Sequence, residues 1–138
     1  MHSSARHLGI YLHLARASQQ RRQPLVRDRL LVLAGALAAT LDLNPIAAYC
    51  RREILSHNPQ HLIRRWPTFD VALGDEDFQS HHKQLKRRYP SEKAEQMLVS
   101  LGIQMARERE TYFSDYEYAA AILGTTTKIL DEQFGESE

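Results

Sequence analysis

Apolar side chains recur along most of this chain at steps of three and four residues, the spacing that places them on one face of an α-helix. The clearest case is residues 25–41, which follow Pro24 and in which Leu recurs at positions 30, 33, 37 and 41 among further Leu, Val and Ala. A helix that is apolar almost all round belongs inside a core, so we expect this segment at the centre of the protein.

Six further segments carry a helical pattern, and prolines and capping residues set their limits. They cover residues 5–18, 46–57, 75–89, 91–105, 116–123 and 126–134. Asn-Pro at 44–45 and again at 58–59 predicts helix starts, because the Asn side chain can accept a hydrogen bond from a free backbone N–H and Pro suits the first turn. Pro90 ends the helix before it, and Ser91 is expected to cap the next one. No segment shows the alternation of a strand bounded by turn signals.

These patterns predict an all-α fold, a compact single-domain bundle of about six or seven helices over residues 1–138, with 1–4 and 135–138 frayed. A chain of 138 residues can bury roughly two-thirds of its surface, so it needs no disulfide or metal to fold. The expected core residues are Leu30, Leu33, Leu37, Ile46, Cys50, Ile54, Leu85, Leu98, Leu101 and Leu123.

Residues 31–59 form a predicted helical hairpin around the short turn at 42–44. Gly35, Ala47 and Pro59 fall where a tetratricopeptide repeat has Gly, Ala and Pro, so this segment resembles one such unit. Four large aromatic or aliphatic positions of the repeat are occupied here by Leu31, Ala34, Ala38 and Arg51. No second copy follows, although solenoids of this kind need about three repeats. The resemblance implies a helical-hairpin geometry rather than a peptide-binding groove.

Charge is unevenly distributed, although the net charge is only +1. Residues 1–69 carry ten Arg against three acidic residues, a net charge of +7, whereas residues 70–138 carry eight basic against fourteen acidic residues, a net charge of −6. One interpretation is that the two halves pack together and neutralise each other, and the other is that a basic face meets an anionic partner. We favour the first, because folds mix sequence halves freely.

The seven histidines show no spacing typical of a metal site. His57 and His61 stand four residues apart, but Pro59 marks a helix boundary between them. His81 and His82 are adjacent, so on a helix they diverge by about 100 degrees and do not share one ion easily. The chain has neither a His-Glu-x-x-His run nor a Glu-x-x-His pair. We therefore predict no metal ligand and expect His82 at the edge of the core.

Cysteine and glycine usage points to no nucleophile and no phosphate-binding loop. Cys50, the only cysteine, lies on the apolar face of its helix, and an unpaired Cys in that place is usually a core residue. Glycines are scattered singly, and Gly35 and Gly102 fall inside helical patterns. The sequence therefore predicts no catalytic residue and no cofactor.

Clusters of basic residues, with two aromatic residues among them, are the candidate interaction surface. The set is Arg51, Arg52, Arg64, Arg65, Trp66, Lys83, Lys86, Arg87 and Arg88, followed by Tyr89. If folding brings the clusters to one face, that face could bind phosphates, with Trp66 or Tyr89 stacking on a base. The interpretation that we favour is that these basic residues solvate helix surfaces and pair with the acidic part of the chain.

The sequence thus predicts a non-enzymatic helical module that binds another protein. The alternative is a nucleic-acid-binding protein that uses the clustered Arg and Lys, and a third hypothesis is an enzyme with an unrecognised site. One cysteine indicates a reducing compartment, and the longest apolar run, residues 30–41, is shorter than the roughly 20 residues that a spanning helix needs. We expect a soluble, cytoplasmic protein without a membrane partner, and the sequence gives no sign of its oligomeric state.

Overall fold

The computed structural model describes residues 3–135, and over these residues it contains nine α-helices, one short 3-10 helix and no β-strand. The helices are α1 (Ser3–Gln20), α2 (Pro24–Thr40), α3 (Asn44–His57), η1 (Leu62–Arg65), α4 (Phe69–Leu73), α5 (Glu76–Arg88), α6 (Ser91–Ser100), α7 (Met105–Glu110), α8 (Asp115–Ile122) and α9 (Thr127–Phe134). The prediction of an all-α protein is confirmed, and the seven predicted helices are all present. None of the described helices is long and apolar enough to cross a membrane.

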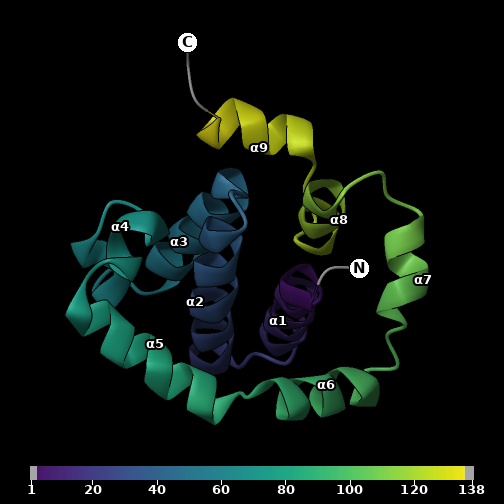
Figure 1. Cartoon of the computed structure of the whole chain (residues 1–138), viewed down its shortest axis with the longest axis horizontal. Helices are drawn as coiled ribbons and strands as arrows, with labels where there is room; N and C mark the ends of the chain where they lie inside the picture. The colour runs from purple at the N-terminus through teal and green to yellow at the C-terminus, as the bar shows by residue number, and fades with distance from the viewer. Residues whose placement is uncertain (1–2, 136–138) are drawn as a thin grey trace.

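The helices are arranged as a central hairpin with an outer arc (Figure 1). Helices α1 and α2 pack side by side, and α3 packs against α2. Helix α4 contacts α2 and α3, α8 contacts α1, and α9 lies on α3. From the far side of α2, helices α5, α6 and α7 follow one another round the molecule, with α6 against α1 and α7 at the outer end. The predicted central position of residues 25–41 is therefore confirmed.

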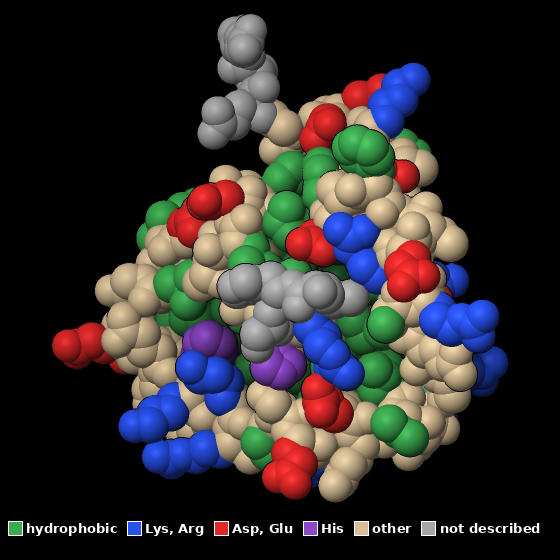
Figure 2. Space-filling model, turned by 45° about the vertical axis from the view of Figure 1, so that its right-hand side comes forward, with side chains coloured by type: hydrophobic (Ala, Val, Ile, Leu, Met, Phe, Trp, Pro, Cys, Tyr) green, Lys and Arg blue, Asp and Glu red, His purple; other side chains and the backbone are tan. Residues whose placement is uncertain are grey.

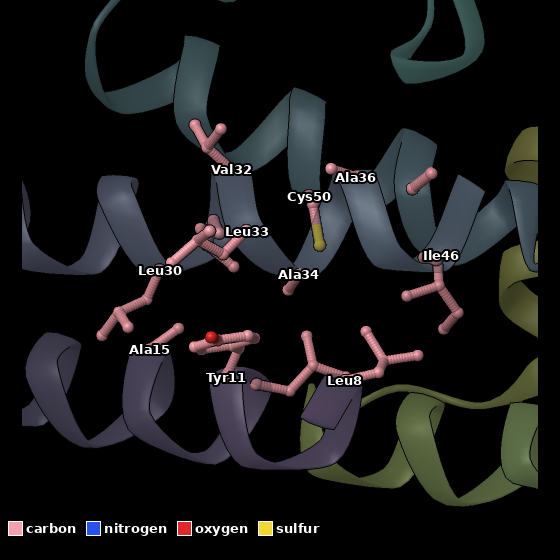
Figure 3. Packing of buried hydrophobic residues seen from close by; sticks show 14 of the residues in the cluster. Leu8, Tyr11, Ala15, Leu30, Val32, Leu33, Ala34, Ala36, Ile46 and Cys50 are labelled. Atoms are coloured by element: carbon pink, nitrogen blue, oxygen red, sulfur yellow. The ribbon is translucent and has the colours of Figure 1, made fainter. Parts of the chain in front are cut away.

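The core is built where α1, α2 and α3 meet (Figure 3). Ala15 and Tyr11 of α1 face Leu30 and Leu33 of α2, Leu8 lies further along α1 towards Ile46, and Cys50 of α3 points into the same space. Each fully buried side chain of this size stabilises the fold by about 1.5–3 kcal/mol. Seven predicted core residues are buried, namely Leu30, Leu33, Ile46, Cys50, Ile54, Leu85 and Leu98.

Three predicted core residues, Leu37, Leu101 and Leu123, are only half-buried and lie at the edge of the core. Leu37 lies between the buried residues Ala36 and Ala38 of α2, and the other two follow directly after α6 and α8. Periodicity identified their helices correctly. Periodicity did not show which apolar residues at the edge of each apolar face reach solvent, because that depends on how the neighbouring helices cover the face.

The predicted helix caps at Asn44, Asn58 and Ser91 are wrong. Asn44 is the first residue of α3, and Leu43 precedes it without a side-chain cap. Asn58 instead ends α3, and its side-chain oxygen accepts a hydrogen bond from the backbone N–H of Gln60 at 3.2 Å. Ser91 lies inside α6 after Pro90. Pro45 and Pro90 lie within a residue of the start of α3 and α6, whereas no helix begins at Pro59 and the next element, η1, begins at Leu62.

The predicted helix over residues 91–105 ends early, and Met105 is the first residue of a separate helix, α7. Helix α6 ends at Ser100, and Gly102 then adopts a φ of +72°, which a right-handed helix does not allow. Gly35, in contrast, lies inside α2 as predicted, where the ring of Phe69 packs so closely that a Cβ would overlap it. The short elements η1, α4 and α7 were not predicted.

The expected fraying of residues 1–4 and 135–138 falls mostly outside the described residues. Ser3 and Ser4 belong to α1, and Gly135 directly follows α9. Gly135 is exposed.

Candidate functional site

The predicted basic residues come from three elements, and Trp66 ties two of them together. The Nε of Arg51, on α3, donates to the backbone oxygen of Trp66 at 3.0 Å. The guanidinium of Arg65, on η1, lies 4.9 Å from the centre of the Trp66 ring and donates to Asp77 at 2.9 Å. Folding thus brings the α3 and η1 clusters close to each other, and both arginines also hold structural contacts.

Neither aromatic residue of this set is available to stack on a base. Trp66 is 5% exposed, with its ring edge-on to Phe78 at 5.6 Å. Tyr89 is equally buried, and its backbone oxygen accepts a hydrogen bond from the hydroxyl of Tyr11 at 2.9 Å. The expectation that either ring could hold a nucleobase is therefore corrected: both rings belong to the core.

The remaining basic residues point into solvent. Arg64 of η1 and the α5 residues Lys83, Lys86, Arg87 and Arg88 are exposed, and none of these five side chains has a hydrogen bond or ion pair with another described residue. Three of them occupy the last turn of α5, where cations offset the partial negative charge of the helix end. This placement explains them structurally without a partner.

Two arginine–carboxylate pairs among the described residues connect the basic and acidic halves of the chain. Arg6 of α1 pairs with Glu95 of α6 at 2.6 Å, and Arg65 pairs with Asp77 of α5. Figure 2, in which α7 comes forward, shows acidic and basic side chains interspersed over this face rather than separated. The interpretation that the two halves partly neutralise each other is therefore supported at these places.

A groove of about 750 Å³ lies between α3 and the chain that leads into α4. One face of α3 lines it with Ala47, Ala48, Arg51, Arg52 and Leu55. Residues 67–70 line it from the other side, together with Phe134 of α9. These α3 residues share a face because they follow one another at steps of one, three and four residues. The groove combines an apolar lining with two guanidinium groups.

Arg52 is held at this groove by aromatic rings. Its guanidinium carbon lies 4.9 Å from the ring centres of both Tyr49 and Phe134. A guanidinium N–H of Arg52 donates to the side-chain oxygen of Gln133 at 2.8 Å. Nε of Arg52 also lies 3.8 Å from a carboxylate oxygen of Glu53. Arg52 is nevertheless exposed, so its charge stays accessible at the edge of the groove.

A buried polar cluster that sequence reasoning missed joins α2 to the C-terminal part of α3. Asp28 of α2 is 3% exposed, and its Oδ2 lies 2.7 Å from Nδ1 of His57 at the end of α3. Oδ1 of Asp28 is buried without a hydrogen bond, although a guanidinium nitrogen of Arg27 is 3.6 Å away. Arg27 also reaches Glu53 at 3.4 Å. A charged pair inside an otherwise apolar helix was the sequence signal that could have identified this cluster.

Three more histidines lie at or near this cluster, and burial lowers the pKa of each. Burial lowers the pKa of His61, which the charge of Asp28 partly opposes, and its ring lies 6.2 Å from that of His81. Burial lowers the pKa of His81 as well, and Nε2 of its ring is buried without a partner. The pKa of His82 falls to about 4, mainly through burial, with Lys86 and His81 adding to the shift. His82 stacks on Phe78 at the core edge, as predicted.

A second polar cluster joins α1, α7 and α8. Nε2 of His13 lies 3.0 Å from the hydroxyl of Tyr118 and 3.3 Å from Oε1 of Glu108, and that hydroxyl donates to Glu108 at 3.0 Å. Burial lowers the pKa of His13, and burial together with Glu108 raises that of Tyr118. The cluster connects α7 to α1 and α8.

The structure adds nothing that would assign metal or thiol chemistry. No group of three or more His, Cys, Asp or Glu side chains among the described residues is placed to hold a metal ion. Cys50 is fully buried, and burial raises its pKa to about 12, so a thiolate is strongly disfavoured.

Comparison with family models, with curated proteins and with solved structures gave no match to this chain. Function is therefore inferred from the geometry and chemistry of the described residues.

Proposed function

We propose that this chain is a helical interaction module that binds a short segment of another protein in the groove between α3 and α4. The observation that carries the proposal is the composition of the groove: Ala47, Ala48 and Leu55 line it beside the guanidinium groups of Arg51 and Arg52. Arg is among the residues that most often carry binding energy at protein interfaces, and apolar side chains around it exclude water from the contact.

The charges of the groove indicate the kind of segment that fits. The two arginines face one acidic residue of the lining, Asp70, so the groove favours a segment with at least one carboxylate. The volume of about 750 Å³ accommodates a few side chains rather than a folded domain. The partner is therefore a peptide segment with an apolar side chain next to Asp or Glu.

The position of the groove in the fold supports a binding role. One wall is the second helix of the tetratricopeptide-like segment 31–59, and that helix packs against the buried α2. A wall held in this way changes little on binding, which lowers the entropic cost of association. The other wall comes from a different part of the chain, so the groove is not the concave surface of a repeat array.

Nucleic-acid binding remains the second candidate, because five basic side chains of η1 and α5 are exposed and unpaired. Phosphates would contact these side chains without base stacking, since Trp66 and Tyr89 are buried. Such binding would be electrostatic and would weaken steeply with salt. Enzymatic activity is not proposed, since no described cluster pairs a nucleophile with a base in an open cavity.

A display library of short peptides, selected on the full chain, tests the proposal. Ala48→Phe places a ring inside the groove, and Ala106→Phe on α7 adds the same ring outside it as a matched control. We expect the selected peptides to share an apolar residue next to an acidic one. They should bind Ala106→Phe like the wild type and lose binding to Ala48→Phe, while Arg52→Gln should weaken them about tenfold, the worth of one charge-assisted contact.

Peptides that bind both Phe variants equally would place the interaction elsewhere and contradict the proposal. Circular dichroism of each variant shows whether the fold is intact. In parallel, binding of a single-stranded and a duplex oligonucleotide is measured at low and moderate salt. Salt-sensitive oligonucleotide binding without any peptide signature would favour the second candidate instead.

A further inference from the structure

The outer arc carries a groove of its own, of about 630 Å³, between α6 and α7 and next to the start of α1. We call it the α6–α7 groove, and it is lined by Arg6, Glu95 and residues 98–99 and 103–107. Apolar side chains form most of its surface, and Val99 among them is 75% exposed. Figure 2, which has this side of the molecule forward, shows apolar side chains reaching the surface between charged ones. Such a groove gains free energy when a partner covers it.

Phe113, in the turn between α7 and α8, is the most exposed large apolar side chain among the described residues, at 96%. Its backbone N–H donates to the carboxylate of Glu117 at 3.3 Å, which helps to fix the turn. A ring exposed to this extent adds almost nothing to the stability of the single chain, because it buries almost no area. Phe113 is therefore available as an anchor for another molecule.

The α6–α7 groove and Phe113 lie at opposite ends of one short helix. Helix α7 has six residues, so it is about 9 Å long, and the groove takes in its first three residues, whereas Phe113 follows its end. When two copies of α7 lie antiparallel about a two-fold axis, the end of each helix lies beside the start of the other. This arrangement carries Phe113 of each copy to the α6–α7 groove of the other copy, so the surface is complementary to itself.

The outer face of α7 is suited to meet a second copy. Met105 and Glu108 face the rest of the chain, the first being buried and the second accepting a hydrogen bond from the hydroxyl of a tyrosine of α8. Ala106, Arg107 and Glu110 share another face at steps of one, three and four residues, and all three are exposed. The small side chain of Ala106 allows a second helix to approach closely.

The charges on this face also favour an antiparallel pair. Arg107 makes one hydrogen bond, at 3.5 Å to the side-chain oxygen of Gln104, and the Glu110 side chain has no hydrogen bond or ion pair with another described residue. An antiparallel second copy brings its Glu110 towards Arg107, and the two-fold axis forms the same pair a second time. A parallel pair would place Arg107 beside Arg107 and Glu110 beside Glu110, which is repulsive.

We infer that two copies of this chain form a two-fold dimer through α7, in which Phe113 of each copy occupies the α6–α7 groove of the other. A Phe side chain buries about 150–250 Å² when it is covered, and the symmetry doubles this contribution. The contact is nevertheless small for a protein interface, so we expect micromolar affinity. The dimer surface shares no lining residue with the proposed peptide groove, so each inference can fail without the other.

Sedimentation equilibrium of the full chain, from low micromolar to near-millimolar concentration, tests the dimer. The mass should rise from 15.9 kDa towards twice that value. Phe113→Ala removes two rings from the dimer and should raise the Kd about a hundredfold, and Ala106→Phe, which fills the groove, should act in the same direction. Leu25→Ala is the matched control, because it removes an exposed large apolar side chain from α2 and should change the Kd by less than about twofold.

A wild-type chain that stays at the monomer mass over the whole range would overturn the dimer. Equal weakening by Phe113→Ala and Leu25→Ala would also overturn it, since association would then be non-specific. Circular dichroism of each variant checks the fold. Phe113 and Ala106 are exposed, so neither change removes a buried contact.

Charge reversal tests the antiparallel pairing of the two copies. Arg107→Glu and Glu110→Arg should each lower dimerisation about tenfold or more, because each places like charges opposite each other twice. An equimolar mixture of the two variants should dimerise with a Kd close to that of the wild type, since both pairs are then complementary. A mixture that stays monomeric, or single variants that dimerise like the wild type, would overturn the arrangement through α7.

Discussion

The hairpin of α1 and α2 with α3 differs from the arc of α5, α6 and α7 in how it is held. In α2, eleven of 17 residues are buried, whereas α6 buries two of ten residues and α7 one of six. The hairpin is therefore stabilised by continuous apolar burial, and the arc by single apolar anchors with polar contacts between them. We infer that the two regions differ in stability, and the groove wall formed by α3 lies in the more stable region.

The largest effect is expected from a cavity in α2. Leu33→Ala removes a side chain that is 1% exposed and should lower the free energy of unfolding by about 2–5 kcal/mol. Leu37→Ala, in the same helix, removes a half-buried side chain and should cost no more than about half of that. Urea denaturation of the two variants measures both values. Equal losses of unfolding free energy in the two variants would show that Leu37 belongs to the core rather than to its edge.

Two glycines give the next largest contrast between the regions. Gly35→Ala would push a Cβ into the ring of Phe69, a buried aromatic residue that cannot move aside, and should destabilise by about 1–3 kcal/mol. Gly9→Ala overlaps only the flexible end of Met105 on α7 and makes ordinary contact with the Tyr118 ring, so the gain in helix propensity of up to about 1 kcal/mol should dominate. Thermal unfolding compares them. Similar losses of stability in both variants would mean that Met105 of α7 is held as rigidly against α1 as Phe69 of α4 is held against α2.

Acid should weaken the fold through His82 of the arc. In the folded chain the pKa of His82 is about 4, against 6.5 for a free side chain, so the unfolded chain takes up a proton first as the pH falls. The stability is therefore complete above pH 6.5 and declines as the pH falls towards 4. His82→Phe keeps a ring next to Phe78 but cannot titrate. The variant should lose less stability than the wild type between pH 7 and pH 5, as read from urea midpoints, and an unchanged loss would contradict this assignment.

The smallest effect is expected at the surface between α1 and α6. Glu95→Gln breaks the ion pair with Arg6, in which both side chains are more than 40% exposed, and should cost no more than about 1 kcal/mol. High salt should leave the variant nearly unchanged while it weakens the wild type slightly. A cost above about 2 kcal/mol in urea denaturation would show that the arc depends on this pair rather than on its apolar anchors.

The sequence was sufficient to predict the long helices, because 17 or 18 residues contain several turns of apolar repetition. It did not predict α4 or α7, since five or six residues span fewer than two turns and show no periodicity. It also did not predict the φ of +72° at Gly102 that separates α6 from α7, because Gly is compatible with a helix as well as with a turn.

The candidate sites depend on contacts that the sequence does not encode locally. Asp28 and His57 lie 29 positions apart, and nothing in their spacing indicates the bond between them. Trp66 was a candidate to stack on a base if the basic clusters met on one face, but the fold buries its ring. The groove arises from α3 and residues 67–70 meeting in space, and only the α3 face was readable from periodicity.

Native-state hydrogen exchange of the full chain is the most direct test of the difference between the hairpin and the arc. Backbone amides of α2 and α3 should exchange only through global unfolding, with the protection that the denaturation experiments give for the whole protein. Amides of α6 and α7 should exchange through a partial opening of lower free energy. Protection of α7 equal to that of α2 would contradict the account, since the arc would then be as firmly held as the hairpin.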